Sequence, residues 1–208
     1  KDIAIAVKQG GPLPENNPRL RMAIQNAKGL NMPKDRVDAA IKRASTKEEK
    51  NFEETIYEGY APHGVPIIVE CATDNPTRTV ANVRLLFSKN GGSMGNSGSV
   101  AFLFERKGVF KFDPSKLNLD ELELDLIDAG AEDISKEEEE IIIYTQFTEF
   151  GHMQKFIESK HLEAKSSELQ YIPTTTKELS EADQDEVLKC VEALESDDDV
   201  QSVYHNLA

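Results

Sequence analysis

The sequence predicts an α+β multidomain protein. It would have an N-terminal three-helix domain, an α+β domain, and a ferredoxin-like βαββαβ domain inserted into the second. Apolar residues follow helical spacing through the first 47 residues, and alternating spacing begins near residue 53. From residue 108 the patterns follow the order strand, helix, strand, strand, helix, strand. A length of 208 residues suits two or three small domains.

The first domain, residues 1–50, is expected to contain three helices. The first helix ends at Gly10, and the second begins with Asn17 as its N-cap and Pro18 at its first position. Gly29 ends the second helix. The third helix shows an i, i+3, i+4, i+7 apolar face made of Val37, Ala40, Ile41 and Ala44. The charged segment 47–51 is predicted to be a linker.

The second domain begins with two predicted strands, 55–60 and 66–71, joined by a hairpin-type turn. Asn75 and Pro76 then start a helix, whose inner face is expected to carry Val80, Val83, Leu86 and Phe87. A further strand is predicted from Ser99 to Phe104. The expected order, strand–strand–helix–strand, is incomplete as a domain without further elements from elsewhere in the chain.

The end of the chain supplies a helix opened by Ser180 and a short strand, 200–205, which need a sheet to join. We therefore expect a discontinuous domain made of 53–106 and 178–208. The inserted ferredoxin-like domain, 108–172, accounts for the remaining pattern. Its predicted elements are 108–112, 119–129, 132–135, 141–145, 149–160 and 164–171.

The composition predicts a cytoplasmic protein that does not enter membranes. The longest apolar run, Ile141–Tyr144, is far shorter than the ~20 residues that span a bilayer. The two cysteines, Cys71 and Cys190, lie in apolar patterns and are interpreted as buried thiols. A reducing compartment fits this usage best.

The charge of the chain is unevenly distributed. The net charge of −14 argues against nucleic-acid binding by the chain as a whole. However, residues 1–47 carry +6, residues 48–112 carry −1, and residues 113–208 carry −19. This asymmetry favours a nucleic-acid surface at the basic end, with the acidic end repelling phosphate.

No catalytic or metal-binding motif is evident, so we expect a protein that is not an enzyme and uses no cofactor, metal or small-molecule substrate. The four histidines lack metal-ligand spacing and are interpreted as surface residues: His63, His152, His161 and His205. The carboxylate runs 137–140 and 197–199 are interpreted as solvated charge. The competing class is a hydrolase or nuclease that uses scattered acidic groups around a metal.

The glycine-rich segment 91–98 is the other candidate motif. A phosphate cradle would lie between a strand and a helix N-terminus, usually with a lysine. This segment instead leaves a helix and enters a strand, without a Gly-Lys-Ser/Thr sequence. It is interpreted as a helix C-cap followed by a tight loop, with a contact loop as the functional alternative.

Basic residues give the candidate nucleic-acid site. Arg21 and Lys28 are seven residues apart, as are Arg36 and Arg43, so each pair shares one helix face. An ordinary solvated helix face is the alternative interpretation. No pattern of Asn or Gln reading positions indicates sequence-specific groove recognition. The predicted site comprises Arg19, Arg21, Lys28, Lys34, Arg36, Lys42 and Arg43, with Arg78 and Arg84 as a weaker second patch.

Several motifs, in order along the chain, resemble the YebC/PmpR family. The resemblance covers essentially the whole chain, and so many motifs in one order make it highly specific. The matching segments are Asn17–Arg21 with Ala27–Lys28, Asn31–Asp35, Tyr57–Gly64, Asp74–Asn75 with Arg78–Thr79, Gly91–Phe104, Gly130–Asp133, Ile172–Pro173 and Val203–Asn206.

The resemblance implies the same three-domain fold and a role in gene expression. Bacterial members are described as probable transcriptional regulators that bind DNA. Mitochondrial relatives are translational activators of cytochrome c oxidase, which implies messenger RNA or the ribosome as an alternative partner. Family members also begin with a basic leader that would add to the binding surface. A protein-interaction scaffold, whose acidic domain meets a basic partner, is a third alternative.

Overall fold

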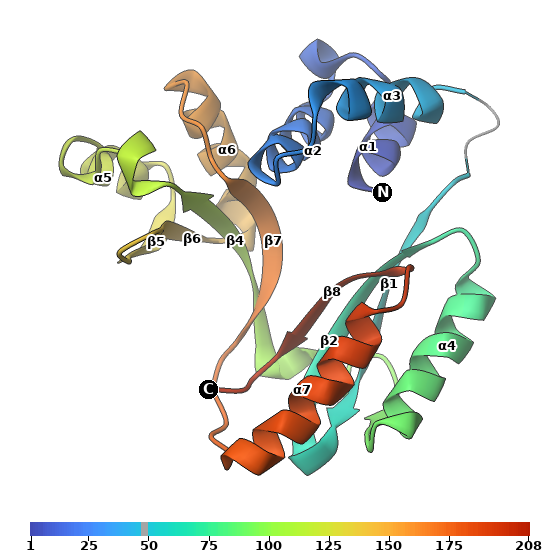
Figure 1. Ribbon diagram of the computed structural model, residues 1–208. Coiled ribbons are helices and arrows are strands. Elements are labelled where there is room, and N and C mark those ends of the chain that lie inside the picture. The colour runs from blue at the N-terminus through green and yellow to red at the C-terminus, as the bar shows by residue number, and fades with distance from the viewer. Residues whose placement is uncertain (47–49) are drawn as a thin grey trace. The chain divides into compact units, whose positions relative to one another are not determined.

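The computed structural model describes residues 1–46 and 50–208, so positions 47–49 of the predicted linker lie outside the described residues. The chain forms two compact units, each built from two separate stretches (Figure 1). Unit 1 comprises Lys1–Glu49 and Arg106–Gln170, and unit 2 comprises Lys50–Glu105 and Tyr171–Ala208.

The N-terminal part of unit 1 is a bundle of three helices, as predicted: α1 (Asp2–Gly10), α2 (Pro18–Gly29) and α3 (Lys34–Ala44). Asn17 is the N-cap of α2, because its side-chain oxygen accepts from the Leu20 amide at 3.0 Å. The Asn17 amide group also donates to the carbonyl oxygen of Ala6 at 2.8 Å. This buried side chain therefore joins α1 to α2. The core of the bundle is thin and rich in alanine: Ile3, Ala6, Val7, Leu20, Ala23, Ala27, Val37 and Ala44.

The rest of unit 1 has the predicted βαββαβ order. Its elements are β4 (Phe104–Phe112), α5 (Leu119–Asp128), β5 (Ala131–Lys136), β6 (Ile141–Gln146), α6 (Phe150–Ser159) and β7 (Ser166–Pro173). The sheet order is β5-β6-β4-β7, so β7 lies at an edge. Residues of the sheet and of both helices, such as Phe110, Leu126 and Met153, share one core.

Helix α2 packs against the start of the edge strand β7. The Asn26 side chain donates to the carbonyl oxygen of Ser167 at 3.0 Å and accepts from its amide at 2.8 Å. Gln25 donates to the carbonyl oxygen of Ala164 at 3.1 Å. A Cβ atom on Gly29 would lie 2.0 Å from the carbonyl oxygen of Lys165. Side chains of α2 thus bond both backbone groups of Ser167, near the start of the edge strand.

Unit 2 is a four-stranded sheet, β3-β1-β2-β8, with antiparallel neighbours. Its elements are β1 (Glu53–Ala61), β2 (Val65–Thr73), α4 (Pro76–Lys89), β3 (Ser93–Met94), α7 (Glu181–Glu195) and β8 (Val200–His205). The predicted C-terminal strand therefore joins the sheet, beside β2. Helices α4 and α7 share a core with it through residues such as Val83, Phe87 and Leu194 (Figure 1).

Two details of the predicted second domain are wrong. The strand expected from Ser99 to Phe104 is instead a loop and a 3-10 turn at Ala101–Leu103, and β4 begins only at Phe104. The physical reason is the Glu58 carboxylate, which accepts the backbone N–H groups that a strand would offer to a neighbour. On α4, Thr79 rather than Val80 is fully buried, because its hydroxyl hydrogen-bonds to Thr73.

Candidate nucleic-acid interface

Helix α3 presents four exposed cations: Lys34, Arg36, Lys42 and Arg43. Val37 and Ala44 fix the helix in the core of the bundle, so the charged side chains point away from it. Arg36 and Arg43 share a face and are separated by roughly 10 Å along the axis. Within residues 1–46 and 50–208, none of the four side chains forms an ion pair or hydrogen bond. They are available to an external anion.

The predicted cations on α2 already contact other groups of the protein. The guanidinium of Arg21 donates to both carboxylate oxygens of Glu158, at 3.2 and 3.3 Å, and to the carbonyl oxygen of Pro14. Lys28 forms an ion pair with Glu163 at 3.6 Å. Arg19 donates to the side-chain oxygen of Gln9 at 2.6 Å. The basic face of α2 is therefore directed in part at acidic residues of the same unit.

Glu163 joins two lysines, because its carboxylate also accepts from Lys116 at 2.9 Å. Lys116 is the largest cause, and Lys28 a smaller one, of a pKa of Glu163 below its usual range. The carboxylate stays ionised at neutral pH, so it competes with phosphate for Lys28.

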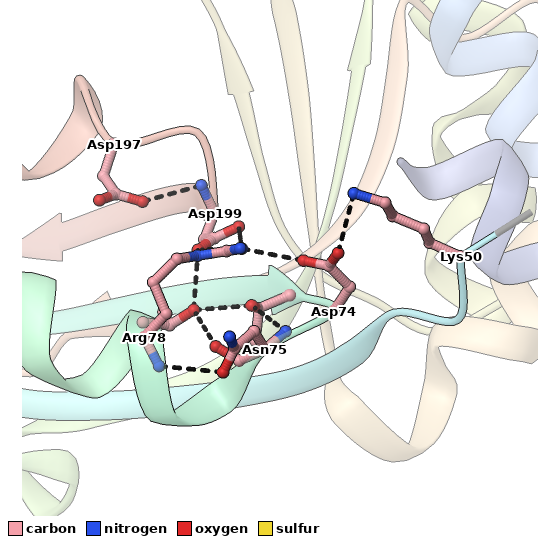
Figure 2. A network of polar contacts seen from close by, with 8 residues as sticks. Lys50, Asp74, Asn75, Arg78, Asp197 and Asp199 are labelled. Carbon is pink, nitrogen blue, oxygen red and sulfur yellow. Dashed lines mark hydrogen bonds and ion pairs between the residues drawn. The ribbon is translucent and has the colours of Figure 1, made fainter.

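Arg78, from the weaker second patch, lies inside a polar network (Figure 2). Its guanidinium contacts Asp74 at 2.9 Å and Asp199 at 3.0 Å, and Lys50 pairs with Asp74 at 3.1 Å. Asp199 is only 5% exposed and also accepts from the Thr79 hydroxyl. Arg78, and secondly Lys50, hold the pKa of Asp74 below its ordinary value. The network joins the N-terminus of α4 to the segment before β8.

Arg84, the other member of that patch, is exposed on α4. Among the described residues its side chain has no ion pair. The structure therefore does not combine Arg78 and Arg84 into one free cationic surface, since Arg78 is committed to two carboxylates.

The glycine-rich loop already contains an internal anion. The Glu58 carboxylate, 5% exposed, accepts from the amides of Gly98 at 2.5 Å, Val100 at 3.0 Å and Ala101 at 2.6 Å. Convergent backbone N–H groups of this kind are the usual ingredients of a phosphate site. Here the donors are satisfied by the protein's own side chain, which anchors the loop.

The histidines differ in their surroundings. His205 is partly buried, and its Nδ1 accepts from the Leu207 amide at 3.2 Å. His152 lies beside one carboxylate, Glu149, at 3.2 Å. The Nε2 of His63 lies 2.7 Å from Glu186 and 3.5 Å from Asp183. His63 and Asp183 are 120 positions apart in the sequence, so residue spacing gave no sign of this cluster.

Both cysteines are buried thiols outside any disulfide, as the apolar patterns predicted. Burial raises the pKa of the Cys190 thiol. Among the described residues, no helix has the length and apolar character needed to cross a bilayer.

Comparison with known families decides the identity. Residues 1–47 match the family described as the TACO1/YebC protein N-terminal domain, and residues 52–207 match the TACO1/YebC second and third domain. The chain belongs to the TACO1/YebC family. The family resemblance seen in the sequence is thereby confirmed.

Individual TACO1/YebC relatives are similar along the whole chain. A probable transcriptional regulatory protein of Cytophaga hutchinsonii is 55% identical, covering 100% of this chain and 87% of the relative. One of Myxococcus xanthus is 54% identical, covering 100% and 89%. The crystal structure of a conserved hypothetical protein from Aquifex aeolicus superposes with a TM-score of 0.85 at 41% identity, covering 100% of this chain and 86% of that one.

Proposed function

We propose that this TACO1/YebC protein is a non-enzymatic, cytoplasmic regulator of transcription that binds DNA through its basic helical end. The single observation that carries the proposal is the set of four exposed cations on α3 that have no partner among the described residues: Lys34, Arg36, Lys42 and Arg43. The names of relatives as probable transcriptional regulatory proteins support the regulatory role. The exposed Arg84, which has no ion pair with a described residue, would add a contact. The paired cations would contribute less: Arg19, Arg21, Lys28 and Arg78.

Phosphate attraction is the physical basis of this binding. Each phosphate that an arginine or lysine neutralises releases condensed counterions, which favours association at low salt. The acidic groups in the rest of unit 1 limit the orientation of an approaching nucleic acid, since they repel phosphate. Contact with nucleic acid is therefore expected at α3 and not along the βαββαβ part of unit 1.

A second candidate function is translational, with ribosomal or messenger RNA as the partner. The specific observation that favours it is the composition of α3, Lys34–Ala44, which contains neither Asn nor Gln. These are the side chains that read adenine edges in the DNA major groove. A surface that contacts phosphates without reading bases serves a structured RNA as well as a duplex.

The domain organisation belongs to the same proposal. We propose a basic helical domain at 1–50, a discontinuous α+β domain at 53–106 plus 178–208, and an inserted acidic ferredoxin-like domain at 108–172. The observed βαββαβ order and the sheet order β5-β6-β4-β7 support the inserted domain.

One experiment tests the function and separates the two partners. The protein is titrated with duplex DNA and co-sedimented with ribosomes at the same salt concentration, as wild type and as the Arg36→Glu/Arg43→Glu variant. We expect the wild type to bind one partner and the variant to lose at least tenfold in affinity for it. Binding to neither partner, equal binding by the variant, or cleavage of the nucleic acid would contradict the proposal.

A further inference from the structure

Three metal-ligating side chains converge at one end of unit 2. His63 lies in the 3-10 turn Pro62–Gly64 that joins β1 to β2, while Asp183 and Glu186 lie one turn apart on α7. The three ligand atoms lie within 4.8 Å of one another. Among the described residues, this is the one group of three such side chains that meets this distance.

The imidazole nitrogen is the centre of the group. The Nε2 of His63 lies 2.7 Å from Oε2 of Glu186 and 3.5 Å from Oδ1 of Asp183. Two carboxylates beside one ring nitrogen place negative charge where a metal cation would bind. The i, i+3 spacing places both carboxylates on the same face of α7.

The backbone of the turn is held in the conformation that directs His63 toward α7. His63 has a φ of 65°, which is uncommon for a residue other than glycine. The Lys177 ammonium donates to the His63 carbonyl oxygen at 2.5 Å. The Lys177 backbone is itself bonded to Asn206 at 2.7 Å and to Ala208 at 3.0 Å. The backbone of His63 is thus held by contacts that do not involve the carboxylates.

We propose that His63, Asp183 and Glu186 form a binding site for a divalent transition-metal ion of the zinc type. One imidazole and two carboxylates are a donor set that zinc accepts, and three protein ligands leave a fourth position for solvent. Imidazole also favours zinc, cobalt or nickel over magnesium and calcium.

The two separations measured from His63 are close to those of a zinc site. Donors at roughly 2.0–2.1 Å from a tetrahedral zinc lie about 3.3 Å from each other. The pair of His63 and Asp183, at 3.5 Å, already has this separation. Glu186 is 62% exposed in its side chain, so it can move outward by the fraction of an ångström that a metal needs.

The electrostatic surroundings favour a cation. Glu181 and Asp185 add two further carboxylates to the first turns of α7. Lys177 opposes them, but its ammonium is directed at a carbonyl oxygen of the turn. The local balance is therefore negative, in keeping with the acidic character of residues 113–208.

The test measures metal binding by the intact chain and needs no activity. Titration calorimetry with Zn²⁺ and visible absorption with Co²⁺ are applied to the wild type and to His63→Gly, because glycine accepts the positive φ without strain. We expect one ion per chain and an affinity at least tenfold lower in the variant. Glu186→Gln, which keeps the size of the side chain, should reduce the affinity as well. Mg²⁺ should not compete.

The matched control is His152→Gly, which removes an exposed histidine beside the single carboxylate Glu149. This variant should bind Zn²⁺ as the wild type does. The proposal is overturned if the wild type binds no Zn²⁺, or if His63→Gly and His152→Gly lower the affinity equally. Unchanged binding in both His63→Gly and Glu186→Gln would also overturn it.

Discussion

Glu58 organises the glycine-rich loop by accepting three backbone N–H groups from residues 98–101. In the Glu58→Gln variant, an NH₂ group would replace one oxygen and face donors instead of accepting from them. We expect a loss of about 1–3 kcal/mol in the free energy of unfolding, since buried amides would be left unsatisfied. Hydrogen exchange should accelerate most at the amide of Gly98, because the remaining oxygen can still accept from Val100 and Ala101 while the NH₂ group faces Gly98. Unchanged exchange there would mean that the loop is held by something else.

His205 makes the stability depend on pH. Burial lowers its pKa below the ordinary value of about 6.5, with Glu195 opposing the shift. The neutral ring is favoured in the folded state, where Nδ1 accepts from the Leu207 amide. Its contribution to stability is therefore complete above the unfolded pKa and is lost as the pH falls through and below it.

The corresponding measurement compares urea unfolding of the wild type and of His205→Phe at about pH 7 and about pH 5. We expect the wild type to lose more stability than the variant over this interval, because only the wild type must protonate the ring. Equal losses in the two proteins would contradict the assignment.

Sequence reasoning at this scale succeeded for local interactions and failed for distant ones. Asn17 and Asn75 were identified as N-caps because the cap and the amide it accepts from are three residues apart. The partner of Arg78, Asp199, is 121 residues away, and that of Arg21, Glu158, is 137 residues away. Residue spacing does not indicate these two distant pairings, so Arg21 and Arg78 were predicted as nucleic-acid-binding residues. The pairing of Arg78 with Asp74 is different, because the two residues have the i, i+4 spacing of a helical ion pair.

At the scale of elements, helix α2 lies very close to the backbone that leads into the edge strand β7. Gly29 permits it, because a Cβ atom there would lie 2.0 Å from the Lys165 carbonyl oxygen. We expect Gly29→Ala to destabilise unit 1 by about 1–3 kcal/mol, as overpacking does. Thermal unfolding would measure the change.

Gly151 is the matched control for this substitution. It lies in α6, and no atom lies within 4 Å of a Cβ built there. Gly151→Ala should therefore be stabilising by about 0.5–1 kcal/mol, because alanine is the better helix former. If both variants were stabilised, α2 would not be packed against β7 in solution.

Helices and strands were predicted correctly where the period of the apolar residues matched the face that is buried. The strand predicted at 200–205 is β8 within the same bounds, and the helix opened by Ser180 is α7. The two-residue strand β3 was missed, because Ser93 and Met94 are too short a run to show alternation. The strand predicted at 99–104 failed because a distant carboxylate, and not a neighbouring strand, satisfies its amides.

At the scale of the molecule, the basic segment 1–47 and the acidic segment around 113–170 belong to the same compact unit. Charge asymmetry along the sequence therefore does not translate directly into separate basic and acidic bodies. The ion pair of Arg21 with Glu158 and that of Lys28 with Glu163 neutralise part of the basic surplus. The exposed cations that remain for phosphate are concentrated on α3. The proposed interface is therefore small and confined to one helix.

The salt dependence of nucleic-acid binding tests this account most directly. Replacing Arg36 and Arg43 by Glu should flatten the slope of log affinity against log salt by about 1.4–1.8, equivalent to two lost phosphate contacts. The control replaces Lys155 and Lys160, two exposed lysines of the same unit, by Glu and should leave the slope nearly unchanged. Equal flattening by both pairs, or flattening only by the control pair, would contradict the assignment of phosphate binding to α3.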